Sequence, residues 1–270
     1  MFDAPPSTTL QRTRGRAHVA LGPGGQLERL GQQGSAKAFL PRTHGDLPEV
    51  VFLNTAGGLT GGDKMEFVLS VGGGAGAIGT TQTAERAYKS PGGHARLDVQ
   101  LRVDAAGRLD WLPQETILFN GSGLRRETHA ELCRGATLLM AETVVLGRGA
   151  MGETVSALEF TDRRVVTRAG VPLMIEPLSL DDVALARPGR AGLDGARALT
   201  TLVFLSQGAE DALGPVRALC EAASFRAFAT AWDGKLIVRA MALDPWPLRR
   251  WLAGVLEQVR GGPLPRVWQV

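Results

Sequence analysis

The sequence predicts a mostly β protein: a layered or helical arrangement of mixed β-sheets, with two α-helices near the C-terminus. Residues 95–103 alternate strictly between apolar and polar side chains, which indicates a half-buried strand. The 35 glycines among 270 residues are dispersed between short apolar runs, as is typical of many tight turns between strands. Apolar residues recur at helical spacing in two segments late in the chain.

Short apolar runs bounded by glycine, proline or polar clusters predict the strands of the first two thirds of the chain. The first two of these runs lie on either side of a glycine-rich turn, and prolines bracket the last, which predicts a short strand or an edge strand. Residues 136–146 are expected to form either one strand or a strand pair. The expected strands are residues 16–21, 36–40, 50–53, 65–71, 75–81, 95–103, 108–112, 115–119, 125–132, 136–146, 156–160, 164–168 and 172–177.

Helices and strands alternate in the last part of the chain. The dipeptide Asp233-Gly234 between two strand-like runs predicts a hairpin. Asp244, followed by a proline, is a suitable cap for the last helix, whose pattern is amphipathic. A strand, a helix, the hairpin and the last helix are therefore expected in this order, at residues 200–205, 211–223, 225–241 and 244–259.

These elements predict one domain that spans residues 1–270, since the chain shows no internal repeat. Its β-rich part is expected at residues 14–180, and its α/β part at residues 198–268. Residues 187–192, between the two parts, are expected to be a linker or a long loop.

Composition limits the cellular setting and the partners. Cys133 and Cys220 are far apart and belong to no metal-binding cluster, which favours reduced thiols in a cytoplasmic protein. The N-terminus lacks the pattern of a signal peptide, and no run of about 18 apolar residues predicts a membrane span. The net charge is +3, and the densest basic stretch, residues 12–16, is more typical of a solvated strand edge than of a nucleic-acid site. We expect neither nucleic acid nor membrane as a partner.

The sequence contains only poor matches to the motifs of enzymes. Residues 74–79 match GxGxxG, and a nucleotide-binding enzyme built on this segment is the main alternative function. The threonine-rich segment that follows is a poor helix start, however, and Pro91 interrupts the crossover helix that such a site needs. Residues 57–64 resemble a P-loop, but Asp63 would repel phosphate. The histidines are isolated, which disfavours a metal site, and no GxSxG or paired Cys/His nucleophile is evident, so we expect no catalytic site. A carbohydrate-binding module is disfavoured by the low aromatic content of 6%.

The most informative segments are residues 54–63 and 80–90. In the first, Gly57, Gly58, Gly61 and Gly62 lie between two strand-like runs, so that the turn can be unusually tight or closely packed. Asp63 follows these glycines at the start of the next strand. This pair of segments resembles the urease accessory protein family UreD, also called UreH.

Further blocks support the resemblance in the order in which the family has them. They are residues 109–119, 146–153 and 264–268, which are similar to the family's blocks LeWLPQ-x-x-I-x-F, GR-x-x-x-GE and PR-x-W. Together the blocks cover nearly the whole chain. The positions that match the family's motifs are Gly57, Gly58, Gly62, Thr81, Gln82, Tyr88, Pro113, Gln114, Gly147, Arg148 and Gly152.

The resemblance implies a scaffold for the nickel centre of urease rather than an enzyme. A UreD-like protein binds apo-urease and docks the accessory protein UreF, which in turn carries the GTPase UreG. A water-filled passage through UreD is proposed to carry nickel towards the urease active site. The resemblance therefore implies no tightly bound cofactor, and nickel only in transit. It also implies a β-rich fold of mixed sheets with two helices.

Acids within otherwise apolar strands are the candidates for lining such a passage. Nickel in transit needs weak, exchangeable oxygen ligands, and an idle buried carboxylate would be costly. Asp63, Glu142 and Glu176 fit this description, and all three align with acidic positions in the family.

Further candidates are Glu85, Glu115 and Glu153. At position 85 the family more often has a small hydroxyl residue, followed by lysine rather than Arg86. Glu153 has an alternative role as the partner of Arg148 in a buried ion pair that fixes a turn. The apolar face of the C-terminal helix, with Trp246 and Trp251, either packs on its own sheet or meets UreF.

Overall fold

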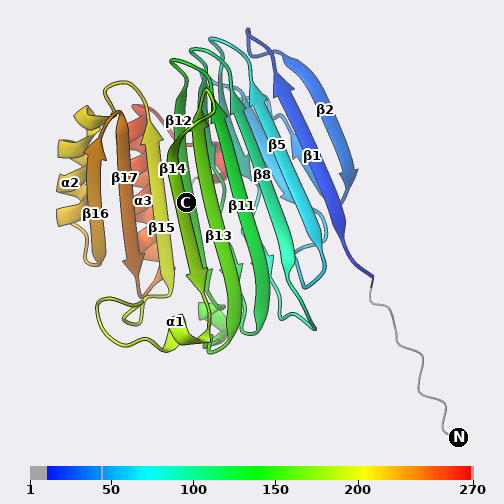
Figure 1. The fold of residues 1–270 in the computed structure, drawn as a ribbon, viewed down its shortest axis with the longest axis vertical. Helices are drawn as coiled ribbons and strands as arrows, with labels where there is room; N and C mark the ends of the chain where they lie inside the picture. The colour runs from blue at the N-terminus through cyan, green and yellow to red at the C-terminus, as the bar shows by residue number, and fades with distance from the viewer. Residues whose placement is uncertain (1–10, 44, 269–270) are drawn as a thin grey trace, which may run out of the picture.

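Two large β-sheets and a layer of helices make up the fold (Figure 1). The computed structural model describes residues 11–43 and 45–268 of the 270-residue chain. The first sheet contains, in spatial order, β14 (Val171–Leu180), β13 (Leu158–Arg168), β11 (Ser122–Leu132), β8 (Ala95–Val103), β5 (Lys64–Val71), β1 (Arg14–Leu21) and β2 (Leu27–Gly34).

The second sheet lies against the first and extends beyond it. Its order is β16 (Arg226–Trp232), β17 (Lys235–Ala242), β15 (Ala198–Leu205), β12 (Thr137–Leu146), β9 (Arg108–Leu112), β6 (Gly76–Thr81), β4 (Glu49–Asn54) and β3 (Ala36–Phe39). Two short strands branch from it, β10 (Thr116–Leu118) beside β12 and β7 (Glu85–Ala87) beside β10. The α-helices are α1 (Asp182–Ala186), α2 (Leu213–Glu221) and α3 (Pro245–Arg260).

The chain winds back and forth between the sheets from β4 to β13. Consecutive long strands belong to alternate sheets, so β5, β8, β11 and β13 are parallel neighbours in the first sheet. Parallel neighbours need a long crossover, which is usually a helix. Here each crossover is a strand of the opposite sheet, and the result is the layered, helical arrangement of mixed sheets that the sequence predicts.

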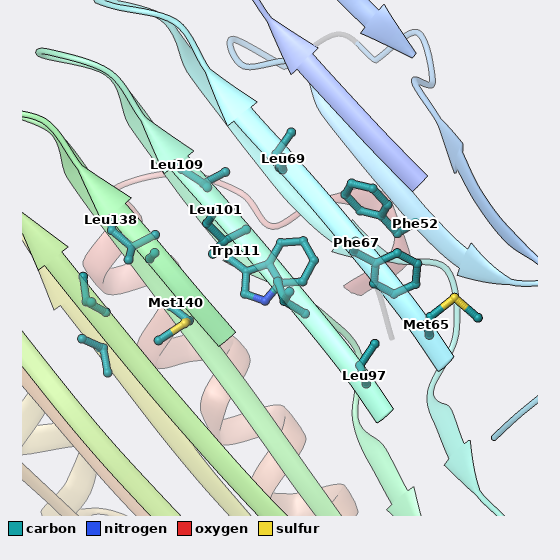
Figure 2. Close-up of a cluster of buried hydrophobic side chains, with 14 of the residues drawn as sticks. Phe52, Met65, Phe67, Leu69, Leu97, Leu101, Leu109, Trp111, Leu138 and Met140 are labelled. Atoms are coloured by element: carbon teal, nitrogen blue, oxygen red, sulfur yellow. The ribbon is translucent and has the colours of Figure 1, made fainter. Parts of the chain in front are cut away.

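Apolar side chains from both sheets fill the space between them (Figure 2). Trp111, which is 1% exposed, packs edge-on against Phe52, with ring centroids 5.8 Å apart. Phe52 in turn contacts Phe67, with ring centroids 5.0 Å apart. The alternation predicted for residues 95–103 is confirmed, because β8 turns Leu97 and its apolar partners into this core. Burial of these side chains is the main stabilising contribution between the sheets.

The two longer helices cover the outer face of the second sheet. Asp244 caps α3 by accepting a hydrogen bond from the Trp246 backbone N–H at 2.9 Å, as predicted. Leu248 and Leu252 of α3 pack into a second core with β17 residues such as Val238. The apolar face of α3 therefore packs on its own sheet. No helix within the described ranges is long and apolar enough to cross a membrane.

Some elements differ from the sequence-based expectation. Residues 27–34, expected within a turn, form the edge strand β2, whose mostly exposed side chains leave no apolar alternation to detect. The expected strands 156–160 and 164–168 belong to one strand, β13. The buried charge of Asp162 separates its two apolar runs, which is why they look like two strands in the sequence. The short helix α1 was not expected. In the GxGxxG segment, residues 76–81 form strand β6 instead of opening a helix, which contradicts the dinucleotide-binding alternative.

The motif glycines provide a test of the packing. A Cβ atom at Gly58 would lie 2.4 Å from the Tyr88 ring and 2.8 Å from the backbone oxygen of Arg86, whereas a Cβ at Gly254 in α3 meets nothing within 4 Å. We expect Gly58→Ala to lower the free energy of unfolding by about 1–3 kcal/mol. The matched change Gly254→Ala should raise it by about 0.5–1 kcal/mol. Urea denaturation measures both, and a neutral Gly58→Ala would contradict the close approach.

Candidate functional site

Four charged side chains lie between the two sheets, at positions where strand neighbours turn apolar side chains inward. They are Arg126 on β11, Glu142 on β12, and Asp162 and Arg164 on β13, and none is more than 4% exposed. We call them the charge cluster. An isolated charge in such a place is costly, so the arrangement of the partners determines whether the fold tolerates it.

Every member of the charge cluster has an ionic partner. Arg126 donates two parallel hydrogen bonds to Asp162, from Nε to Oδ1 at 2.9 Å and from Nη2 to Oδ2 at 2.7 Å. Arg164 donates from Nε to Glu142 Oε2 at 2.5 Å and from Nη2 to Asp162 Oδ2. Two guanidinium groups thus balance two carboxylates. Paired, hydrogen-bonded geometry of this kind is what makes buried charge tolerable.

Glu142 keeps its charge in this setting. Burial alone would raise the pKa of Glu142, but the guanidinium groups of Arg126 and Arg164 outweigh it and lower the pKa to about 2. Thr128 also donates a hydrogen bond to Glu142 Oε1 at 3.2 Å. The side chain is therefore a permanent carboxylate at neutral pH.

A cavity of about 40 Å³ borders the charge cluster and is partly open to the surface, because exposed residues such as Gly57 and Thr83 also line it. Glu142, Arg126, Thr116 and Glu85 all line it, and Glu85 is the register partner of Thr116 between β7 and β10. The family-motif residues Thr81, Pro113 and Gln114 also line it. The cavity is large enough to hold water.

Two donors in the cavity wall favour water as its content. Trp111 Nε1 and Gln114 Nε2 are buried and have no hydrogen-bond partner within the described residues. Both residues line the cavity. Because an unmet buried donor is costly, a water molecule in the cavity is the partner that chemistry favours.

Glu85 is the acid of the cavity wall that titrates near neutral pH. Its carboxyl accepts hydrogen bonds from Asn54 Nδ2 at 3.3 and 3.4 Å and from the Arg86 backbone N–H at 3.1 Å. Burial raises the pKa of Glu85 to about 7, against the smaller, lowering effect of the Asn54 hydrogen bond. The Arg86 guanidinium instead donates to the backbone oxygen of Gly57 at 3.4 Å.

A row of alternating charges leads from the cavity wall to the surface. Arg164, already bound to Glu142, brings Nη1 to within 3.8 Å of Glu176 Oε1 on β14. Arg239 on β17 donates from Nε to the same Glu176 oxygen at 3.1 Å. The Glu176 side chain is 14% exposed and that of Arg239 is 56% exposed. Two of the three acids predicted to line a passage, Glu142 and Glu176, are therefore brought together through Arg164.

Asp63 lies in a different setting, at the glycine-rich turn. Its two carboxylate oxygens accept hydrogen bonds from the Thr13 and Thr60 backbone N–H groups, at 2.7 and 2.8 Å. Gly62 beside it has φ of +91°, a conformation that side chains rarely adopt. Asp63 thus closes this turn, and its role in a passage stays a prediction.

Glu115 and Glu153 also have structural partners. Both oxygens of Glu115 accept from Arg249 Nη1 at 3.1 Å, which ties β10 to helix α3. Glu153 pairs with Arg148 at 2.8 Å, and this bond lowers the pKa of Glu153 to about 2. The predicted ion pair therefore exists, but the prediction that it is buried is wrong, because the Arg148 side chain is 46% exposed. A passage role for Glu115 and Glu153 stays a prediction.

The remaining motif residues hold turns around these sites. Tyr88 donates its hydroxyl to the backbone oxygen of Gly57 at 3.0 Å and packs edge-on against Phe119. The Arg148 guanidinium lies over the Phe119 ring, 4.4 Å from its centroid. The Gln82 backbone N–H donates to a neighbouring strand, and Gly57, Gly147 and Gly152 all have positive φ.

Sequence reasoning missed Arg126, Asp162 and Arg164. The sequence signal that reveals them is the alternation of buried and exposed positions along β13 and β11. In β13 the buried positions run Leu158, Phe160, Asp162, Arg164, Val166, so two charges interrupt the apolar face of a strand. Arg126 interrupts the buried face of β11 in the same way. Charges in the buried phase of a strand predict partners on a facing strand.

Comparisons with known proteins all match the chain to the same family. A family model described as "UreD urease accessory protein" matches residues 13–269. A protein of Cereibacter sphaeroides (strain ATCC 17025 / ATH 2.4.3), named "Urease accessory protein UreD", is 56% identical over 269 residues, which cover 98% of both chains. Proteins with the same name from Paracoccus denitrificans (strain Pd 1222) and Rhizobium leguminosarum bv. trifolii (strain WSM2304) are 47% and 42% identical. Both alignments cover 100% of this chain, and 97% and 100% of the two relatives, respectively.

The charge cluster generates a stability prediction. Glu142→Gln leaves two buried guanidinium groups facing one carboxylate, so we expect it to lower the free energy of unfolding by about 3–5 kcal/mol. Glu142→Gln combined with Arg164→Met removes one charge of each sign and should cost less than the sum of the two single changes. Urea denaturation of the three variants measures the coupling. Strict additivity would contradict the mutual pairing.

Glu85 generates a pH prediction. Because folding raises its pKa from 4.5 to about 7, stability from this group is full below pH 4.5 and is lost as the pH rises towards 7. Glutamine cannot ionise, so the Glu85→Gln variant does not lose this stability as the pH rises. The variant should gain about 2 kcal/mol relative to the parent between roughly pH 5 and pH 8, an estimate reduced for partial solvent access.

Denaturation curves across that pH range measure the difference between the two proteins. A constant difference would show that Glu85 does not titrate in this range.

Proposed function

The chain belongs to the UreD family of urease accessory proteins, as its motifs predict, and from this we propose that it binds apo-urease and the UreF–UreG complex and carries nickel towards the urease active site. Membership itself gives the chain an accessory role in urease maturation and an association with the urease maturation machinery, rather than a catalytic role. We propose the individual partners and the route of nickel in addition to this role.

The polar cavity beside the charge cluster is the observation that carries the proposal. It combines two carboxyl groups, Glu85 and Glu142, with room for water. Divalent nickel that passes through a protein needs oxygen ligands that it can leave again. Glu142 is also held by arginines, and Glu85 by the Asn54 amide, so each carboxyl exchanges a ligand when a cation arrives and departs.

Arg164 lies between the cavity and the outside. It contacts Glu142 on one side and approaches Glu176 on the other, and Glu176 also lines a surface hollow. The proposed route runs between Glu176 at the surface and Glu85 in the cavity, past Glu142. A cation on this route competes with the Arg164 guanidinium for both carboxylates, which keeps its binding weak.

The protonation state of Glu85 adds a condition to this route. With a pKa of about 7, Glu85 is divided between its neutral and charged forms at neutral pH. A divalent cation that binds there releases a proton, so transfer is coupled to pH.

A cytoplasmic location also belongs to the proposal. Cys133 and Cys220 are free thiols, which suits a reducing compartment. No resident cofactor is required, since nickel is the cargo. The absence of nucleic-acid and membrane partners stays a prediction.

Nickel transfer can be tested with two isosteric changes, Glu85→Gln and Glu176→Gln. Each keeps the volume of the side chain but removes an anionic ligand, so we expect nickel incorporation into urease to slow by roughly tenfold. Glu131→Gln, at an exposed position of β11, is the matched control and should have no effect. The measurement is nickel per urease active site over time, in cells that co-express urease, UreF, UreG and the variant.

The same preparations show whether the complex with urease and UreF forms. Normal nickel content in both variants, with the complex intact, would contradict the passage and leave the accessory role in place.

A further inference from the structure

The second sheet extends past the edge of the first. β14 is the edge strand of the first sheet, and β15, β17 and β16 continue beyond it in the second (Figure 1). Helices α2 and α3 lie behind these three strands and cover one face of them (Figure 1). The opposite face of β15, β17 and β16 lies beyond β14, so the described part of the first sheet does not cover it.

Strand alternation places large apolar side chains on this open face. Ala227 and Ala229 of β16 pack towards the helices, so Phe228 between them faces the other way, as does Trp232. Phe228 is 68% exposed and Trp232 is 45% exposed, and Ile175 of β14, 54% exposed, lies across from them. All three residues line one hollow of about 850 Å³. A concentration of exposed large apolar side chains in one hollow is typical of an interaction site.

The side chains that line the hollow carry a net positive charge. Arg226 and Arg239 line it together with one acid, Glu176. Glu176 is already engaged by Arg239 and approached by the buried Arg164. Lys235 lies over the Trp232 ring at 5.4 Å and approaches Asp233 at the hairpin turn, at 3.9 Å, so this pair adds no net charge. A surface that complements the hollow is therefore apolar with carboxylates at its margin.

Two other kinds of occupant fit less well. An added strand would need backbone donors along the edge of β14, but Pro172 and Pro177 within β14 have none. A second copy of the chain, related by a two-fold axis, would bring Arg226 and Arg239 of both copies into one interface, and like charges oppose each other there.

We propose that this hollow is the docking surface for a partner protein, which inserts an amphipathic helix with an apolar face and carboxylates at its margin. A helix on a sheet face repeats the packing that α2 and α3 show on the opposite face. The inference rests on the proposed function, because Glu176 at the hollow is the outer end of the proposed nickel route. A helix seated there covers that end and excludes bulk water from it.

The test uses the full tagged chain, co-expressed with urease subunits, UreF and UreG of the same host. Phe228→Asp and Trp232→Asp place a charge on the apolar surface and should weaken retention of one of these proteins by roughly thirtyfold, as expected for central aromatic contacts. Arg239→Glu should weaken it as well, through repulsion of the partner's carboxylates. Leu27→Asp, on β2 at the far edge of the first sheet, is the control, since Leu27 is 46% exposed, much like Trp232.

The outcomes separate the inference from the function on which it rests. If the parent chain retains the partners and all three variants retain them equally, the docking surface is wrong and the accessory function stands. If the parent retains none of them, the proposed function fails. The isolated parent chain is examined by size-exclusion chromatography and by flotation with phosphatidylserine vesicles. A dimer that Phe228→Asp abolishes, or vesicle binding that it abolishes, would assign the hollow to a second copy or to a membrane and overturn the proposal.

Discussion

Mutual neutralisation of four buried charges is the constraint on which the site depends. Arg126, Glu142, Asp162 and Arg164 come from three strands in two sheets, and each carboxylate is bound by a guanidinium group. Since an unpaired member would carry most of its desolvation cost, the strands can hold these residues only in one register. That register places Glu142 in the cavity wall and points Arg164 towards Glu176. The side chains that neutralise one another in the core are therefore the same ones that border the proposed nickel route.

The winding of the chain explains why such a cluster can form at all. Consecutive strands alternate between the sheets, so residues 126, 142 and 164, from three consecutive long strands, face one another across the core. The same winding leaves the last strands, β15 to β17, as an extension of one sheet only. The helices cover one side of this extension, and its other side is the hollow at which the charge row ends.

Much of this fold could be predicted from local pattern, and less of the site. The alternation of β8 and the Asp244 cap of α3 are local signals, and both were confirmed. β2 escaped prediction because its exposed side chains carry no apolar period. Asp63 and Glu142 looked equivalent in sequence, as acids beside apolar runs, but backbone N–H groups hold the first and arginines hold the second. That difference arises from strand pairing over long sequence separations, which a single sequence does not display.

The order of the elements also bears on how the chain is made. During synthesis the winding can add one strand to each sheet in turn, and the charge cluster is complete once residue 164 has emerged. Leu139 and Val145 of β12, however, belong to the second core, whose covering helices lie at residues 213–221 and 245–260. A nascent chain thus exposes an apolar sheet face until its last segment leaves the ribosome. During that interval the uncovered face is prone to aggregation, so a protein with an accessory role in the maturation of an enzyme faces an assembly hazard of its own while it is being made.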